Sequence, residues 1–255
     1  MRASWLILFL LIGSLAHADG PSAEEIARRA LRADAASWEG SRIRMRMALL
    51  PKDGSRSERQ MEIVARRTGK RIETVIRFTA PASIAGTAFL SRELSDGSTE
   101  QHIYLPRLKR TRRIVGRERE GSFLGSDFSY ADMQRIDPRY AKHTKLPDEN
   151  VGADPCYVIE TSIDPKAGSS YGKMVTWVRK RDDVALRTRF HDHEGALVKT
   201  LYARRVREID GKLVVVEARM QDAKSGHATE LVIDAMDPAK DLPDTAFTPA
   251  ALEHM

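Results

Sequence analysis

The chain has 255 residues, of which 42% are hydrophobic and 31% are charged, and its 42 basic against 36 acidic side chains give a formal charge of +6. This composition is typical of a globular protein with one β-rich domain or two small ones, and it excludes disorder, a collagen-like fibre and a small disulfide scaffold for the whole chain. A net positive charge of this size does not by itself identify a nucleic-acid-binding protein.

The first eighteen residues have the pattern of an export signal. Arg2 precedes a continuous apolar run at residues 5–12, and Ala16 and Ala18 supply the small residues that a signal peptidase reads. An uncleaved membrane anchor is the alternative, but the run up to Ala16 has 12 residues, whereas a bilayer-spanning helix needs about 20. We therefore expect cleavage after Ala18 and an exported mature protein, residues 19–255, without a lipid-attachment cysteine.

An amphipathic helix is predicted at the start of the mature chain. Ser22 and Glu25 have the spacing of a capping box. Apolar residues then recur at helical spacing with arginines on the other side, namely Ile26, Ala27, Ala30, Leu31 and Ala35 against Arg28, Arg29 and Arg32. Such a helix needs an apolar surface to lie on.

From residue 41 the hydrophobic period changes to two, which is typical of half-buried strands. Strands are expected at 41–49, 61–66, 71–78, 87–93, 102–105, 110–115, 157–163, 174–179, 186–191, 198–206, 213–220 and 229–235. Short turns such as Asp53-Gly54 and Thr68-Gly69 separate these runs. The order predicts a mainly β protein with few helices, in which an antiparallel meander curls on itself. No linker divides residues 19–255, so we expect a single domain.

The apolar face of these strands is rich in flexible side chains. Met45, Met47, Met61 and Met220 lie at inward positions, and aromatic residues make up only 6% of the chain. Methionines fill ordinary cores, and they also line adaptable surfaces for flexible apolar ligands. The pattern alone leaves both interpretations open.

Two segments resemble a known family. Residues 81–90 read Pro-Ala-Ser-Ile-Ala-Gly-Thr-Ala-Phe-Leu, and residues 121–130 read Gly-Ser-Phe-Leu-Gly-Ser-Asp-Phe-Ser-Tyr. Both resemble the LolA-like outer-membrane lipoprotein-sorting proteins, especially the periplasmic branch encoded beside RND-type or MmpL-like lipid exporters. The resemblance implies a strongly curved, unclosed antiparallel β-barrel of about 11 strands with helices covering its opening. It also implies a periplasmic carrier that holds acyl chains of a lipid or lipoprotein in an apolar cavity. We expect the protein to be a monomer.

The second segment also has a physical interpretation. Gly121 and Gly125 permit backbone conformations closed to other residues, and Asp127 or Ser129 can cap a short helix over residues 130–133. In the family such a segment would lie near the cavity mouth, whereas an ordinary loop-to-helix plug is the alternative. The candidate lipid contacts are the apolar residues of this segment and of the strands: Met45, Met47, Met61, Ile76, Phe78, Phe89, Phe123, Leu124, Phe128, Tyr130, Met133 and Met220.

One basic stretch accounts for the surplus charge. Residues 106–120 hold seven basic and two acidic side chains, and the mature chain without Arg2 has the same net +5. A solvated surface is one explanation, and contact with phosphate headgroups, transiently at a membrane surface, or with an acidic transporter surface is the other. The candidate contacts are Arg107, Lys109, Arg110, Arg112 and Arg113. Nucleic acid is not expected, because the stretch lacks interleaved aromatic residues.

Catalytic and metal-binding patterns are weak. The chain has no Gly-rich phosphate loop, no Gly-x-Ser-x-Gly elbow and no His-Glu-x-x-His helix. His191-Asp192-His193 is interpreted as a surface turn, and the single cysteine, Cys156, as a buried small hydrophobe of a strand. We expect neither an enzyme nor a cofactor or metal. An envelope-stress sensor with the same cavity and an exported hydrolase on a similar barrel are the alternative functions.

Overall fold

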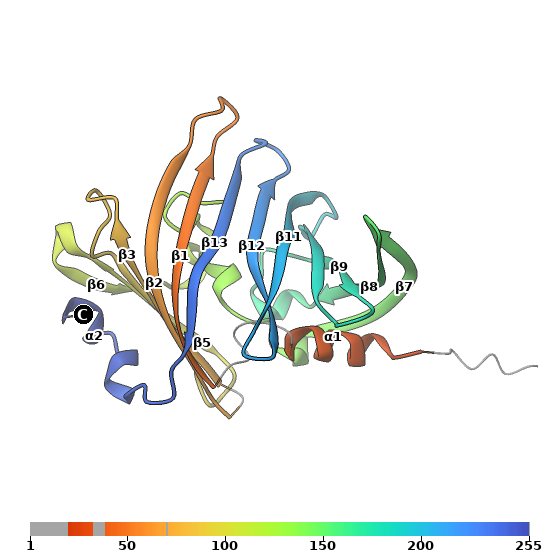
Figure 1. Ribbon diagram of the computed structural model, residues 1–255, viewed down its shortest axis with the longest axis horizontal. Coiled ribbons are helices and arrows are strands. Elements are labelled where there is room, and N and C mark those ends of the chain that lie inside the picture. Colours follow the sequence, from red (N-terminus) through yellow and green to blue (C-terminus); the bar gives the residue numbers. More distant parts are fainter. Residues whose placement is uncertain (1–19, 33–38, 70, 255) are drawn as a thin grey trace, which may run out of the picture.

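The computed structural model describes residues 20–32, 39–69 and 71–254 (Figure 1). The expected signal at residues 1–18 and Ala35 lie outside the described residues. The helices are α1 (Ala23–Arg32) and α2 (Ala251–His254), with 3₁₀ turns η2 (Pro106–Leu108), η3 (Gly116–Glu120), η4 (Tyr130–Met133), η5 (Pro138–Tyr140), η6 (Pro165–Ala167) and η7 (Asp244–Phe247). The strands are β1 (Gly40–Leu50), β2 (Ser57–Thr68), β3 (Arg71–Ala80), β4 (Ala88–Glu93), β5 (Thr99–Leu105), β6 (Arg110–Arg113), β7 (Ala141–Val151), β8 (Asp154–Ile163), β9 (Lys173–Arg179), β10 (Ala185–His191), β11 (Leu197–Ile209), β12 (Lys212–Asp222) and β13 (Ala228–Pro238).

The strands form one open, curved antiparallel sheet. Their order is β6-β5-β4-β3-β2-β1-β13-β12-β11-β10-β9-β8-β7. Strands that follow one another in sequence therefore pair, with the exception of β6 and β7, and one pair of strands distant in sequence meets at the centre. There the first strand pairs with the last, with Met47 opposite Leu231. Strands β6 and β7 form the two free edges, and the sheet does not close. The antiparallel meander is confirmed, but the described residues hold 13 strands, one more than the twelve stretches predicted from the hydrophobic pattern and more than the about 11 expected for the barrel.

The strand missing from the sequence-based prediction is β7. It contains Pro147 followed by Asp148 and Glu149, and most of its side chains are exposed. The register with β8 shifts between Leu146 and Glu149, where the proline interrupts the ladder. Proline is tolerated at a free edge, because the missing N–H removes no hydrogen bond from an inner ladder. An exposed edge strand has no alternating apolar face, and this explains why the hydrophobic pattern did not predict it.

The two faces of the sheet are covered by different segments. We call inner the face to which Met45, Met47 and Leu49 point, and outer the opposite face. Residues 114–140, which we call the crossover segment, lead from one edge strand to the other and pack on the inner face. On that face Phe123 and Phe128 share a buried cluster with Met47. Each fully buried aromatic side chain of this kind contributes about 2–3 kcal/mol to folding.

Helix α1 covers the inner face near the other edge. The backbone N–H of Glu25 donates to Ser22 Oγ at 3.2 Å, as expected from the capping spacing. Ile26 is fully buried and packs with Ile159 of β8 and Val178 of β9. Ile159 lies on the inner face, because directly paired residues of neighbouring strands point to the same side of a sheet. A row of such pairs leads from Ile159 across the sheet to Thr176, Thr188, Leu201 and Met220. The predicted amphipathic helix thus finds its apolar surface on the sheet. None of the helices in the described part of the chain is long and apolar enough to cross a membrane.

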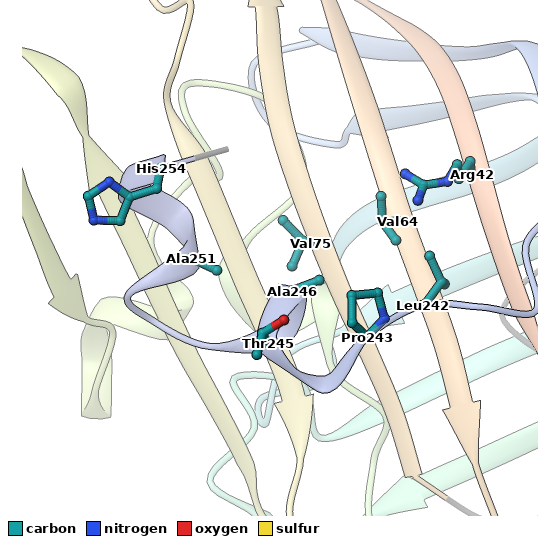
Figure 2. A pocket seen from close by; sticks show the side chains of 9 residues that line it. All are labelled: Arg42, Val64, Val75, Leu242, Pro243, Thr245, Ala246, Ala251 and His254. Atoms are coloured by element: carbon teal, nitrogen blue, oxygen red, sulfur yellow. The ribbon is translucent and has the colours of Figure 1, made fainter.

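The C-terminal segment covers the outer face of β2 to β5. Phe247 and Leu252 are buried there against Val75 and Leu90. The Arg66 guanidinium lies 4.4 Å from the centroid of the Phe247 ring. A cavity of 360 Å³ remains between this segment and the sheet. Figure 2 shows its lining residues, which are Arg42, Val64, Val75, Leu242, Pro243, Thr245, Ala246, Ala251 and His254.

Candidate functional site

The inner face carries an aromatic cluster centred on Phe123 of the crossover segment. The Phe123 ring is fully buried, and its centroid lies 5.2 Å from that of Phe89, 5.5 Å from Tyr130 and 6.0 Å from Phe78. The contacts with Phe89 and Tyr130 are edge-to-face, an arrangement that adds about 0.5–1.5 kcal/mol per pair beyond the buried area. The crossover segment therefore fills this half of the inner face.

The backbone of residues 121–133 determines how these rings are presented. Gly125 has a φ of +80°, and Leu124 has a φ of +54°, which is uncommon for a residue with a side chain. Gly121 has a φ of −64° in an extended conformation that other residues also adopt, so the prediction of an unusual backbone conformation at Gly121 was wrong. At Gly121 an added Cβ would instead lie 3.1 Å from the carbonyl oxygen of Glu118, so close packing favours glycine.

The capping prediction for this segment is settled by two hydrogen bonds. Ser129 Oγ accepts from the backbone N–H of Asp132 at 3.3 Å, and the Asp132 carboxylate accepts from the backbone N–H of Ser129 at 2.6 Å. Ser129 is therefore the N-cap of η4, with a reciprocal capping box. Asp127 has a different role.

Asp127 attaches the crossover segment to β13. Its carboxylate accepts from Thr229 Oγ1 at 2.7 Å and lies 2.7 Å from His227 Nδ1. Its backbone N–H donates to the same Thr229 hydroxyl at 2.9 Å. These partners are about 100 residues away in sequence. The motif aspartate thus fixes the segment across the sheet.

Asp132 makes a second attachment, to β11. Lys199 Nζ donates to Asp132 Oδ2 at 2.5 Å and to the Asp127 carbonyl oxygen at 3.1 Å. Tyr171 donates its hydroxyl to Asp132 Oδ1 at 2.9 Å. Burial, followed by the Asp132 carboxylate, raises the pKa of Tyr171 above its usual value. The side chains of Lys199 and Asp132 are both more than 90% buried. Each residue therefore stabilises the charge of the other, which would be costly to bury without a partner.

A band of apolar side chains on the inner face remains only partly buried. Its residues pack against the aromatic cluster from β1, β2, β10, β11 and β13: Met45, Ile63, Phe190, Leu201 and Leu231. Four of the five were not predicted as ligand contacts. The alternating pattern had placed them in strands, but it could not show which half of the inner face the crossover segment would cover.

Similarity to known proteins assigns the family. A family model described as "-like: Uncharacterized protein" matches residues 70–254, and no curated protein matches the chain. A domain from Vibrio parahaemolyticus that is named for outer-membrane lipoprotein sorting is 29% identical. The two structures superpose with a TM-score of 0.83 over 91% of this chain and 98% of that one. The chain belongs to the LolA-like family.

Two further structures show the extent of the LolA-like fold. A DUF1329 family protein from Desulfovibrio piger is 26% identical, with a TM-score of 0.84 over 91% of this chain and 100% of that chain. A LolA superfamily protein from Nitrosomonas europaea is 20% identical, with a TM-score of 0.72 over 90% and 98% of the two chains, and it shares the fold. The similarity therefore covers most of this chain and nearly the whole length of each of the three structures.

The structure brings all twelve predicted lipid contacts of this LolA-like chain into one cluster. Nine are buried, and their side chains contact packed neighbours: Met47, Met61, Ile76, Phe78, Phe89, Phe123, Phe128, Tyr130 and Met220. Met45, Leu124 and Met133 are partly exposed. The predicted grouping is thus present, while the surface available to a ligand in this conformation comes from the partly exposed members.

The basic stretch divides into two parts. Arg112 pairs with Glu118 at 2.9 Å, and Arg113 lies 3.6 Å from Glu100. Arg107, Lys109 and Arg110 are exposed and form no ion pair with any acid in the described residues. Three cations without an acidic partner therefore lie together at the tip of the β5–β6 hairpin. Arg117 and Arg119 of η3 also have no ion pair among the described residues, but Arg119 donates a hydrogen bond to the Thr99 carbonyl oxygen at 2.7 Å.

The other chemical candidates have structural positions. His191 Nδ1 lies 3.1 Å from the Gly195 carbonyl oxygen in the β10–β11 turn, and His193 Nε2 lies 2.8 Å from that of Ser169, so the predicted turn is confirmed. Cys156 is fully buried, and burial raises the pKa of its thiol. Among residues 20–32, 39–69 and 71–254, no three His, Cys, Asp or Glu side chains are placed to hold a metal.

Proposed function

We propose that this LolA-like chain is a periplasmic carrier that holds the acyl chains of a lipoprotein or lipid against its inner face. The band of Met45, Ile63, Phe190, Leu201 and Leu231 carries the proposal, because it leaves apolar surface partly exposed inside a curved sheet. Soluble proteins rarely leave contiguous apolar surface exposed unless something binds to it. The Vibrio relative that is named for lipoprotein sorting supports the same role.

Apolar burial supplies the affinity in this proposal. Each buried methylene contributes about 0.8 kcal/mol, so a chain of about 14 methylenes that is half buried gains about 6 kcal/mol. Methionine, leucine and isoleucine side chains adapt to chains of different length and shape. No chemical step is needed for such transfer, and we propose a monomeric protein that acts without catalysis, cofactor or metal.

The route is the finer part of the proposal. The chain receives its cargo from an inner-membrane transporter of the RND or MmpL type and carries it toward the outer membrane. Export of the mature protein after cleavage at Ala18 places it in the right compartment for this route. Photo-crosslinking from exposed positions of the protein in its native host tests the transporter partner, which is expected in the crosslinked product.

Copurified lipid is the direct test of the carrier. The protein is isolated from its own compartment, extracted with organic solvent and analysed by mass spectrometry, and acyl-chain lipid is expected at a stoichiometry near one. Leu231→Asp introduces a charge into the apolar band and is expected to lower that stoichiometry at least tenfold.

The next residue of the same strand supplies the matched control. Val232 is also partly exposed but lies opposite Arg46, on the outer face. Val232→Asp is expected to keep the lipid. A lipid-free wild-type protein, or equal loss of lipid in both variants, would overturn the proposal.

A further inference from the structure

The tip of the β5–β6 hairpin exposes one large apolar side chain. Leu108 is 67% exposed, the highest value among the large hydrophobic residues of the described chain. It ends η2 and precedes Lys109, which has a left-handed φ of +46°. At the base of the tip, Leu105 packs against the aromatic cluster of the inner face. The tip is thus anchored at its base while Leu108 is presented to the surroundings.

Cations surround this leucine. Arg107 and Lys109 flank it in sequence, and Arg110 is the first residue of β6. All three are exposed and without an ion pair in the described residues. Glu253 accepts a hydrogen bond from Thr111 Oγ1 at 2.6 Å, so one acid lies beside the strand, but the three cations outnumber it. The tip therefore combines a net positive charge with an exposed apolar side chain.

We infer that this tip binds the surface of a membrane that carries anionic phospholipids. The headgroup phosphates of such a bilayer match Arg107, Lys109 and Arg110, and the adjacent hydrocarbon accepts Leu108. An acidic protein surface would match the charges but offers a charged and hydrated environment to the leucine. The position of β6 at a free edge, on the left of Figure 1, leaves the tip accessible to a flat surface.

The tip of the β5–β6 hairpin is separate from the inner face that holds the proposed cargo. Its function would be to place the open sheet beside the bilayer while acyl chains move between the two. A carrier that failed to bind cargo could still bind vesicles through this tip, so the two proposals fail independently.

Sedimentation with vesicles tests the inference. The mature protein is mixed with vesicles of phosphatidylglycerol and phosphatidylethanolamine, and in parallel with phosphatidylcholine alone. We expect binding to the anionic vesicles, little binding to the neutral ones, and a strong decrease as salt is raised above about 100 mM. Reversal of the tip charges by Arg107→Glu, Lys109→Glu and Arg110→Glu is expected to weaken binding at least a hundredfold, at roughly fivefold per cation removed.

A charge-matched variant distinguishes the tip from general electrostatics. Arg204→Glu, Arg207→Glu and Lys224→Glu change the net charge equally at exposed sites elsewhere and are expected to retain most of the binding. Leu108→Ser is expected to weaken binding about tenfold and to keep the salt dependence, whereas Leu197→Ser, at another exposed leucine, changes little. Equal loss in the two charge variants, unchanged binding of the tip variant, or no binding of the wild-type protein to anionic vesicles would each overturn the inference.

Discussion

Lys199 of β11 and Asp132 of the crossover segment form a buried ion pair, with Nζ 2.5 Å from Oδ2. The two residues are 67 positions apart in sequence. Tyr171 donates to the other oxygen of the same carboxylate, so the pair belongs to a network that satisfies its hydrogen bonds. This network determines where the motif segment lies on the inner face.

Removal of the lysine leaves a carboxylate buried without its counter-ion. Lys199→Met is expected to lower the free energy of unfolding by about 3–5 kcal/mol, measured by urea denaturation. Lys142→Met, at an exposed lysine of β7, should change it by less than about 0.5 kcal/mol. In the double variant Lys199→Met, Asp132→Asn the loss should be smaller than the sum of the single losses. Additive losses would show that the two side chains are not coupled.

The hydroxyl of Tyr171 makes stability depend on pH in the alkaline range. Its pKa is raised in the folded protein, so above the usual tyrosine pKa of about 10 the unfolded chain loses a proton that the folded chain keeps. The stabilisation is complete below that pH and decreases as pH rises. We expect wild type to exceed Tyr171→Phe by about 1–3 kcal/mol at pH 8 and the difference to shrink by about 1.4 kcal/mol per pH unit above 10. A constant difference from pH 8 to 11 would contradict the assignment.

Two buried phenylalanines distinguish the faces of the sheet. Phe123 lies on the inner face and Phe247 on the outer face, and both are at most 1% exposed. Phe123→Ala and Phe247→Ala are each expected to lower the free energy of unfolding by about 3–5 kcal/mol. Hydrogen exchange over residues 121–133 should increase in Phe123→Ala and not in Phe247→Ala. The amount of copurified lipid should also increase only in Phe123→Ala, because loss of the Phe123 ring opens space on the inner face. Equal lipid content in both variants would show that the ring does not limit access.

The left-handed backbone conformation at Gly125 predicts how strongly two substitutions lower the stability of the protein. Gly125 has a φ of +80°, where a Cβ is strained even though the nearest side chain, Arg59, is 3.7 Å from the added atom. Gly125→Ala is expected to lower the free energy of unfolding by about 1 kcal/mol. Gly125→Asn should cost less, because asparagine tolerates this conformation better than alanine does. Thermal unfolding of both variants checks the order, and a more stable alanine variant would contradict it.

Local alternation predicted most of the sheet. Residues 41–49 alternate because β1 is buried on one face and solvated on the other, and the same reasoning located twelve of the strands in the described chain. It could not predict β7, since an exposed edge strand with Pro147 buries no continuous face. Nor could it predict that β1 and β13 would pair, because register between distant strands leaves no local pattern.

The candidate site was predictable in its apolar part only. The family motif and the methionine-rich strands identified residues that do pack together. The polar attachments were missed: Lys199, His227 and Thr229 lie in ordinary strand and turn sequences, and their importance comes from Asp127 and Asp132 far along the chain. A buried lysine has no sequence signal until its acidic partner is located in space.

The pairing of the first and last strands has a consequence for how the molecule forms. At the centre of the sheet Arg46 meets Asp234 across 188 positions of sequence. During synthesis or translocation each half can form hairpins from neighbouring strands, but the seam that joins the halves waits for the final strand to emerge. Closing so long a loop makes this step slow. A chain that stopped before β13 would leave the edges of β1 and β12 both unpaired, and these are the strand edges at which β proteins aggregate.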